Sequence, residues 1–204
     1  MLYVNVGDYK NVWDELIRDI PQMRELATEY FDNWKDTKAF ATKALSASQI
    51  NNSDVVTDNN RDDNSKNITA DNSSEDTSDN ITGIHGFYHK NIFEAVYCTN
   101  LLMRSADVLV TKPSELAFYP VPKLFIKRVG GHEQWGAVHS AEIGDGTLEC
   151  RDIPHTLQMI KLFMEDDTYI IDMCKNIKKN KQMGIYNGAY EAVKLAVNMK
   201  KSDI

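Results

Sequence analysis

Two short polar segments of this sequence could form part of a ligand-binding site. Each follows an apolar run and precedes a run with helical spacing. Glycines in such a segment let backbone N–H groups approach an anion at the start of a helix. The candidate residues are Lys112, Ser114 and Glu115 in the first segment, and Gly130, Gly131, His132 and Glu133 in the second.

The elements that must position these residues alternate between strands and helices. Runs rich in β-branched residues predict strands at 2–6, 84–89, 108–111, 123–127 and 147–150. Helical spacing predicts helices at 11–20, from Pro21, at 36–45, at 92–105, from Ser114, and at 134–142, 154–164, 169–180 and 188–200. Such alternation implies parallel pairing, so we expect an α/β fold, a three-layer Rossmann-like domain with a mainly parallel sheet.

Apolar spacing also predicts which helical residues face the core. In the first helix these are Val12, Leu16 and Ile20, and in the helix over 92–105 they are Phe93, Val96 and Leu102.

Ligands of such sheets bind outside the carboxyl ends of the strands. Gly7 and Asp8 follow the first strand, so they join the two polar segments as candidate site residues. Gly144-Asp145-Gly146 instead joins a helix to a strand, which places it at the opposite rim and predicts a plain turn. His85 and His89 are interpreted as surface or loop residues rather than metal ligands.

Each candidate also has a purely structural interpretation. Ser114 and Glu115 could simply cap a helix, because Ser is favoured at the N-cap and Glu in the first turn. Gly130 and Gly131 could form an ordinary strand-to-helix turn, with His132 as an exposed partner of Glu133.

The chain is expected to form a single domain over residues 1–204, with residues 46–82 as a disordered acidic insert. Of those 37 residues, 26 are Asn, Asp, Ser or Thr, so the segment cannot bury enough apolar area to offset the entropy of ordering it. It holds eight acidic and two basic residues, which is most of the net charge of −7. The remainder is nearly neutral, which argues against a nucleic-acid-binding face.

Several other protein classes are disfavoured because the sequence lacks their motifs. It has neither GxGxxG nor GxxxxGK[ST], which disfavours a dinucleotide fold and a P-loop NTPase, and no GxSxG elbow of a hydrolase. Its three cysteines lack metal-binding spacing, so we expect reduced thiols and no metal site. With no membrane-length apolar run and no signal-peptide pattern, the chain is expected to be cytoplasmic.

The segment ADVLVTKPSELAFYPVPKLFIKRVGGHEQWGA, residues 106–137, resembles the nucleotide-sugar-binding C-terminal domain of GT-B glycosyltransferases. The nearest likenesses are the peptidoglycan N-acetylglucosaminyltransferase and monogalactosyldiacylglycerol synthase family. Their pattern is a strand ending in a turn, a Glu that opens a helix, a Pro before the next strand, and a Gly-Gln/His-Glu loop. Here the matching residues are Thr111-Lys112, Glu115, Pro122 and Gly131-His132-Glu133. The likeness is specific over residues 106–146 and only topological elsewhere.

The resemblance implies roles for these residues. Glu115 would accept hydrogen bonds from the ribose hydroxyls, residues 131–133 would touch the donor's sugar and phosphates, and Gly7-Asp8 would face the diphosphate. The implied ligand is a UDP-sugar as donor substrate, with no cofactor. The implied partner is an acceptor-binding domain or subunit, which in this family carries the usual catalytic base, so the catalytic residues stay unknown.

Three functions stay open at this point. The first is the donor domain of a glycosyltransferase, and the second is part of a nucleotide-sugar 2-epimerase-like enzyme, which would be told apart by its products. The third is a non-catalytic binding or scaffold module, favoured by the short connection between Lys112 and Glu115. The amphipathic C-terminal run EAVKLAVNMKK, with its basic end, could also make a peripheral contact with a membrane or a partner domain.

Overall fold

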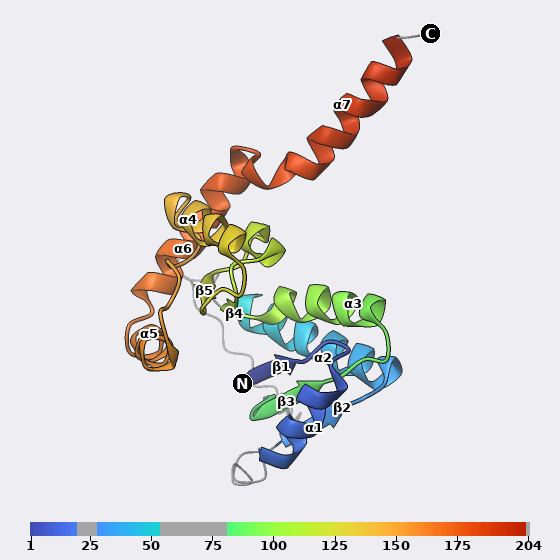
Figure 1. The fold of residues 1–204 in the computed structure, drawn as a ribbon, viewed down its shortest axis with the longest axis vertical. Helices are drawn as coiled ribbons and strands as arrows, with labels where there is room; N and C mark the ends of the chain where they lie inside the picture. Colours follow the sequence, from blue (N-terminus) through green and yellow to red (C-terminus); the bar gives the residue numbers. More distant parts are fainter. Residues whose placement is uncertain (20–27, 54–80, 203–204) are drawn as a thin grey trace, which may run out of the picture. The chain divides into compact units, whose positions relative to one another are not determined.

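The computed structural model describes residues 1–19, 28–53 and 81–202 of the chain. The sequence predicts a single domain. In the structure, the contacts within the chain cluster into two compact units, Met1–Ser105 (unit 1) and Ala106–Ile204 (unit 2). Each unit contains its own parallel sheet, drawn in blue to green for unit 1 and yellow-green for unit 2 in Figure 1. Each unit is therefore described by itself.

Unit 1 is built on a sheet of three parallel strands. These are β1 (Leu2–Asn5), β2 (Thr28–Phe31) and β3 (Ile84–Phe87), in the order β1-β3-β2. The register pairs Leu2 and Thr28 with Ile84, so all three strands end at the same edge. The third strand along the chain, β3, is therefore the central one. Among the first three strands of a doubly wound sheet, the central one is instead the second strand in the Rossmann order and the first strand in the flavodoxin order.

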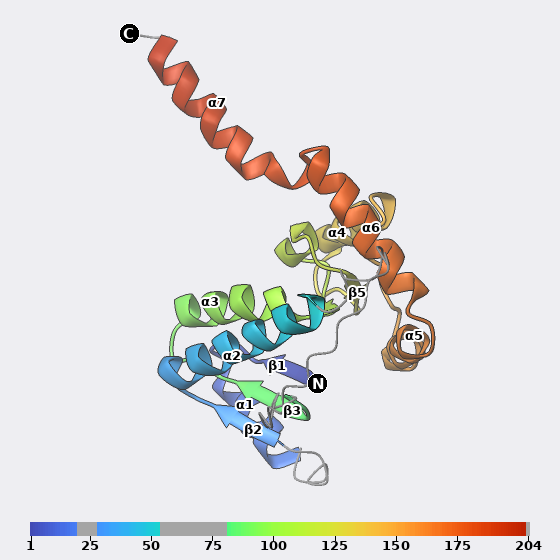
Figure 2. The same ribbon diagram turned by 180° about the vertical axis from the view of Figure 1, so that it is seen from behind.

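Helices cover both faces of this sheet. Phe87 points to one face, where it packs with α2 (Trp34–Ser53) and α3 (Ile92–Leu102), two helices that lie side by side in Figures 1 and 2. Gly86 faces the other way, and its missing side chain leaves room for α1 (Lys10–Asp19), because a Cβ there would lie 3.2 Å from the ring of Trp13. Alternating strand residues thus divide the core of unit 1 into two layers.

Unit 2 is built on two parallel strands, β4 (Leu109–Thr111) and β5 (Lys123–Phe125), with Thr111 paired to Phe125. Helical elements again lie on both faces. Phe125 packs with Ala117 and Ala137, and Leu124 packs with Cys150 and Phe163. The elements of this unit are the 3₁₀ helices η3 (Glu115–Phe118), η4 (Gly131–Glu133) and η5 (Ile185–Asn187), and the α-helices α4 (Gln134–Glu142), α5 (Ile153–Glu165), α6 (Thr168–Gln182) and α7 (Gly188–Ser202).

At this level the expected fold class is confirmed: the chain is an α/β protein with parallel strands. The helices predicted at 134–142, 154–164, 169–180 and 188–200 are present within a few residues. Among the described residues, no helix is both long enough and apolar enough to cross a membrane.

Some local expectations were wrong, and others fall outside the described residues. The strand expected at 147–150 is extended backbone that hydrogen-bonds along β5, with Thr147 donating to Lys123 and Cys150 to Phe125, but it forms only an isolated bridge at Gly146. β2 was not foreseen, and the helix expected from Pro21 falls on residues 20–27, outside those described. α2 continues to Ser53, into the segment 46–82 that was expected to be disordered, and Ile81 at its other end packs against the core of unit 1. Residues 54–80 lie outside the described residues.

Two helices bury residues that the apolar spacing did not select. In α1 the buried residue is Trp13 and Val12 is 41% exposed, whereas Leu16 is half-buried and lies against Gly86, as expected; Ile20 lies outside the described residues. In α3 the buried residues are Ala95, Cys98 and Leu102, while Phe93 is 76% and Val96 is 49% exposed. Of the core residues expected in α3, only Leu102 is buried. Ala95 and Cys98 are buried in place of Phe93 and Val96, because small residues let α3 pack closely on α2.

Candidate functional site

The candidate site of unit 2 lies where β4 and β5 end. The backbone N–H of Ile126 donates to the carbonyl of Thr111 at 2.9 Å, which extends the pairing by one residue beyond β5. The turn 112–114 and the loop 126–133 therefore leave the same edge of the sheet. This places the two polar segments of the sequence together, as their positions after parallel strands predicted.

The turn after β4 is tight and opens into a shorter helix than expected. Ser114 donates its N–H to the carbonyl of Lys112 at 2.8 Å and begins η3, but its side chain makes no capping hydrogen bond. η3 spans only Glu115–Phe118, because Tyr119 is already extended and Pro120 follows. Glu115 lies in the first turn with its side chain exposed.

Gly136 holds this turn against α4. A Cβ at Gly136 would lie 2.7 Å from the carbonyl oxygen of Pro113 and 3.2 Å from the Cβ of Ala117. The absent side chain lets the first turns of α4 pack directly on η3 and on the turn that carries Lys112.

Replacing Gly136 by Ala is expected to lower the free energy of unfolding by about 1–3 kcal/mol, because a rigid backbone oxygen must move to admit the methyl group. The gain in helix propensity, about 1 kcal/mol for Gly→Ala, opposes this loss in part. Urea unfolding of the two proteins measures the difference. The matched control is Gly131→Ala, where a Cβ would meet no atom within 4 Å. An equal loss in both variants would contradict the close approach at Gly136.

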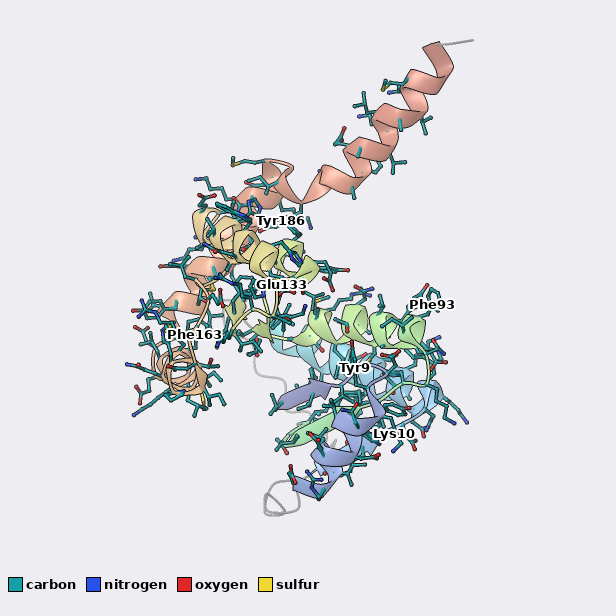
Figure 3. The ribbon with its side chains drawn as sticks, in the orientation of Figure 1. Tyr9, Lys10, Phe93, Glu133, Phe163 and Tyr186 are labelled. Carbon is teal, nitrogen blue, oxygen red and sulfur yellow. The ribbon has the colours of Figure 1, made fainter. Side chains whose placement is uncertain are left out.

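Glu133 closes the loop after β5. Its carboxylate accepts the N–H of Val129 at 2.8 Å and that of Gly130 at 3.1 Å, and it pairs with the ammonium of Lys112. The hydrogen bond from Lys112, followed by those from the two backbone N–H groups, lowers the pKa of Glu133 to about 2. The side chain is only 8% exposed and is labelled in Figure 3. Lys112 and Glu133 are thus brought together as a bridge between the two strand ends.

This bridge corrects one expectation about the glycine loop. The N–H of Gly130 was expected to be offered to an external anion, but the carboxylate of Glu133 already accepts it. Glu133 does not accept the N–H groups of Gly131 and His132, which are both exposed and form the first turn of η4. Helix N-terminal N–H groups in such a turn lack an intrahelical acceptor, so this is where an anion would be received.

The basic residues next to the loop differ in their ion pairs and in their exposure to solvent. Arg128 is bound to Glu149, with Nη1 at 2.8 Å from Oε2 and the backbone N–H at 2.8 Å from Oε1. Lys127 is exposed. Lys112, although tied to Glu133, keeps 45% of its side chain exposed and so could also contact a ligand at this edge.

Gly7 and Asp8 belong to unit 1, so the structure does not bring them together with the other candidates. Gly7 has a φ of +66°, a conformation that favours glycine. Its N–H donates to the side-chain oxygen of Asn5 at 3.0 Å, and its carbonyl accepts the N–H of His89 at 2.9 Å. Asp8 is exposed; Tyr9, which follows it, and Lys10, the first residue of α1, are labelled in Figure 3.

The two histidines are buried, so the interpretation as surface or loop residues is wrong for His85 and holds for His89 only in that it lies in a loop. His85 lies in β3 with 3% exposure, its ring nitrogens 3.1 Å from Glu29 and 3.0 Å from the carbonyl of Thr82. His89 follows β3 with no exposed surface, and within the described part of the chain neither of its ring nitrogens has a hydrogen-bond partner. Burial lowers the pKa of His89, so its imidazole is neutral. No spacing pattern in the sequence signals this burial.

Gly144-Asp145-Gly146 was expected to be a plain turn, but Asp145 belongs to a buried polar cluster. Its carboxylate and the ammonium of Lys123 are both fully buried, 2.8 Å apart. The hydroxyls of Ser140 and Tyr186 also donate to Asp145, the second at 2.8 Å; Tyr186 is labelled in Figure 3. This cluster joins β5, α4 and η5 at the end of the sheet opposite the candidate site. Because its charged groups are buried and paired with each other, the cluster is part of the scaffold of unit 2.

At the coarse level, fold and site define an α/β protein with a polar carboxyl edge built from two loops. The chain matches the family described as "Domain of unknown function (DUF6938)" over residues 1–72 and 47–197. It therefore belongs to that family. No curated protein and no solved structure matches the chain significantly.

Proposed function

We propose that this chain is the donor-binding domain of a GT-B glycosyltransferase and binds a UDP-sugar at the carboxyl edge of β4 and β5. The proposal includes the finer fold, a Rossmann-like domain that forms one half of a GT-B architecture. It also includes a cytoplasmic location, with a peripheral membrane contact as an option, and an acceptor-binding domain or subunit as partner. No nucleic acid and no cofactor take part.

One observation carries the proposal: three chemically distinct groups gather at that edge. Glu115 presents an exposed carboxylate three residues after Lys112, and Lys112 is joined to Glu133 at the end of the neighbouring strand. Gly131 lies in open space at the start of η4. A carboxylate for the ribose diol, a lysine for phosphate charge and an uncrowded helix start for phosphate oxygens are the groups that a nucleoside diphosphate needs.

The reaction would be a metal-independent displacement at the anomeric carbon of the sugar. The acceptor oxygen forms a bond to that carbon, the bond to the diphosphate breaks, and UDP leaves with the electron pair. Lys112 and the N-terminal N–H groups of η4 would stabilise the charge that develops on the leaving diphosphate. The base that takes the acceptor's proton would come from the partner domain.

Calorimetric titration of the full chain with UDP tests the proposal. Glu115→Ala is expected to weaken UDP binding about tenfold or more, since it removes a charged hydrogen-bond acceptor from the ribose. Glu142→Ala is the matched control, because Glu142 is also exposed and lies at the far end of α4. Equal binding by wild type and Glu115→Ala would remove Glu115 from the site, and no saturable binding by the wild type would overturn the proposal.

A second candidate, a binding or scaffold module that has lost the nucleotide, is favoured by one specific observation. The carboxylate of Glu133 occupies the N–H groups of Val129 and Gly130, which leaves fewer donors for a diphosphate. Glu133→Gln separates the two candidates. It would improve UDP binding if that carboxylate only repels phosphate, and it would weaken binding if Glu133 holds Lys112 and the loop in place for the donor.

A further inference from the structure

Beside the candidate site, unit 2 exposes two large aromatic side chains. Trp135 is 70% exposed in the first turn of α4, and Phe118 is 59% exposed at the end of η3. The ring of Phe118 contacts that of His139, with 5.5 Å between the ring centroids. Aromatic rings carry large apolar areas, so leaving two of them in water has a cost that the packing of unit 2 does not explain.

Helical geometry joins these rings to Glu115 in one surface. Residues three apart are eclipsed in a 3₁₀ helix, so Glu115 and Phe118 lie on the same side of η3. Residues four apart are neighbours on an α-helix, so Trp135 and His139 lie on the same face of α4. The contact between Phe118 and His139 connects the two pairs. We name the group of Glu115, Phe118, Trp135 and His139 the Trp135 surface.

The opposite face of α4 accounts for the position of these rings. Its buried residues are Gly136, Ala137 and Ser140, small side chains that pack towards η3 and β5. The aromatic residues are therefore held outward on a well-packed support. α4 continues directly from η4, and Trp135 is its second residue, so the Trp135 surface lies close to the exposed Gly131 and His132.

We propose that the Trp135 surface binds the pyranose ring of the donor sugar. The apolar C–H face of a pyranose packs on an aromatic ring, and its hydroxyls hydrogen-bond to an imidazole. The Trp135 surface offers both groups, two exposed rings and the half-buried His139, while its Glu115 stays with the ribose hydroxyls of the nucleotide. The inference rests on the proposed function for the identity of the donor, but the sugar contact can be tested without a nucleotide.

Fluorescence of the full chain isolates this contact. Of the three tryptophans, Trp13 is buried at 5% exposure and Trp34 is half-buried, so acrylamide quenches mainly Trp135. The probes are UDP, UDP-N-acetylglucosamine and free N-acetylglucosamine. We expect both sugar-containing probes, but not UDP alone, to protect the emission from quenching. Trp135→Phe, which removes the reporter and keeps a ring, checks the assignment.

Calorimetry then measures the energetic contribution of the ring. UDP-N-acetylglucosamine is expected to bind wild type more tightly than UDP does, and Trp135→Ala is expected to weaken its binding about three- to tenfold while leaving UDP unchanged. Trp135→Phe should retain most of the advantage. Tyr190→Ala is the matched control, because Tyr190 is 69% exposed on α7 of the same unit.

The outcomes distinguish this inference from the proposed function. UDP binding with an unchanged sugar advantage in Trp135→Ala would overturn the Trp135 surface alone. Full protection of Trp135 by UDP without sugar would assign the ring to the base and would also overturn it. If UDP does not bind but free N-acetylglucosamine protects Trp135, the sugar surface stands and the glycosyltransferase proposal falls. If no probe binds, both fall.

Discussion

Replacing Asp145 by Ala is expected to lower the free energy of unfolding by about 3–5 kcal/mol, because it leaves a buried ammonium without its counter-ion. Lys123 has no exposed surface, and its Nζ also donates to the carbonyls of Tyr119 at 2.8 Å and Val121 at 2.9 Å. Two carbonyls cannot offset the lost carboxylate. Burial already lowers the pKa of Lys123, and only the bond to Asp145 opposes that shift.

Urea unfolding at neutral pH measures this effect, and the chain contains a matched control. Lys175 and Asp172 form an ion pair of 2.7 Å on the surface of α6, with side chains 70% and 58% exposed. Asp172→Ala should cost at most about 1 kcal/mol, as surface pairs do. A loss as small in Asp145→Ala would show that water reaches the buried pair. The double variant Lys123→Met/Asp145→Leu should recover most of the loss, since it removes both charges.

Glu133→Gln is expected to open the loop 126–133 and to remove its acid sensitivity. In the native chain the pKa of Glu133 lies near 2, against an ordinary value of 4.5, because Lys112 and the N–H groups of Val129 and Gly130 stabilise its charge. A carboxyl whose pKa is lowered by folding contributes stability above its unfolded pKa. That contribution is lost as the pH falls from about 4.5 through about 2.

Hydrogen exchange of the Val129 and Gly130 amides reports this loop directly. At neutral pH we expect both amides to exchange at least about tenfold faster in Glu133→Gln, since an uncharged amide is the weaker acceptor. In wild type their protection should decline over the acid window, and in the variant it should not. Glu142→Gln, an exposed change in the adjoining helix, should leave both amides unaffected. Unaltered exchange in Glu133→Gln would show that other contacts hold the loop.

The two strand ends of unit 2 could be predicted from sequence because every signal for them is local. The run VLVT before Lys112-Pro113 and the run KLFIK before the glycine pair each show where a strand ends. Parallel pairing then places both loops at one edge. The bridge from Lys112 to Glu133 was not predicted, because its partners lie 21 residues apart and only the packing of α4 brings them together.

Asp145 shows why the remainder could not be predicted. Gly-Asp-Gly is a strong local turn signal, and nothing in the neighbouring residues indicates that the carboxylate is directed inward to Lys123. The position of His89 depends in the same way on the turn at Gly7, 82 positions earlier in the chain. In α3 both faces carry apolar residues, so periodicity alone could not choose between Val96 and Cys98. Burial of such residues depends on contacts with residues far away in the sequence, which local patterns do not reveal.

The exposure of α7 determines how readily a protease cleaves the native chain there. Each of its residues from 188 to 199 is exposed, and the helix is 15 residues long, close to the length at which isolated helices are marginal in water. Its opening therefore costs few of the contacts that hold β4, β5 and α4 together. Under mild trypsin treatment of the native chain, cleavage after Lys194 should be among the first cuts, while the bonds after the buried Lys123 and the paired Arg128 survive until unit 2 unfolds as a whole.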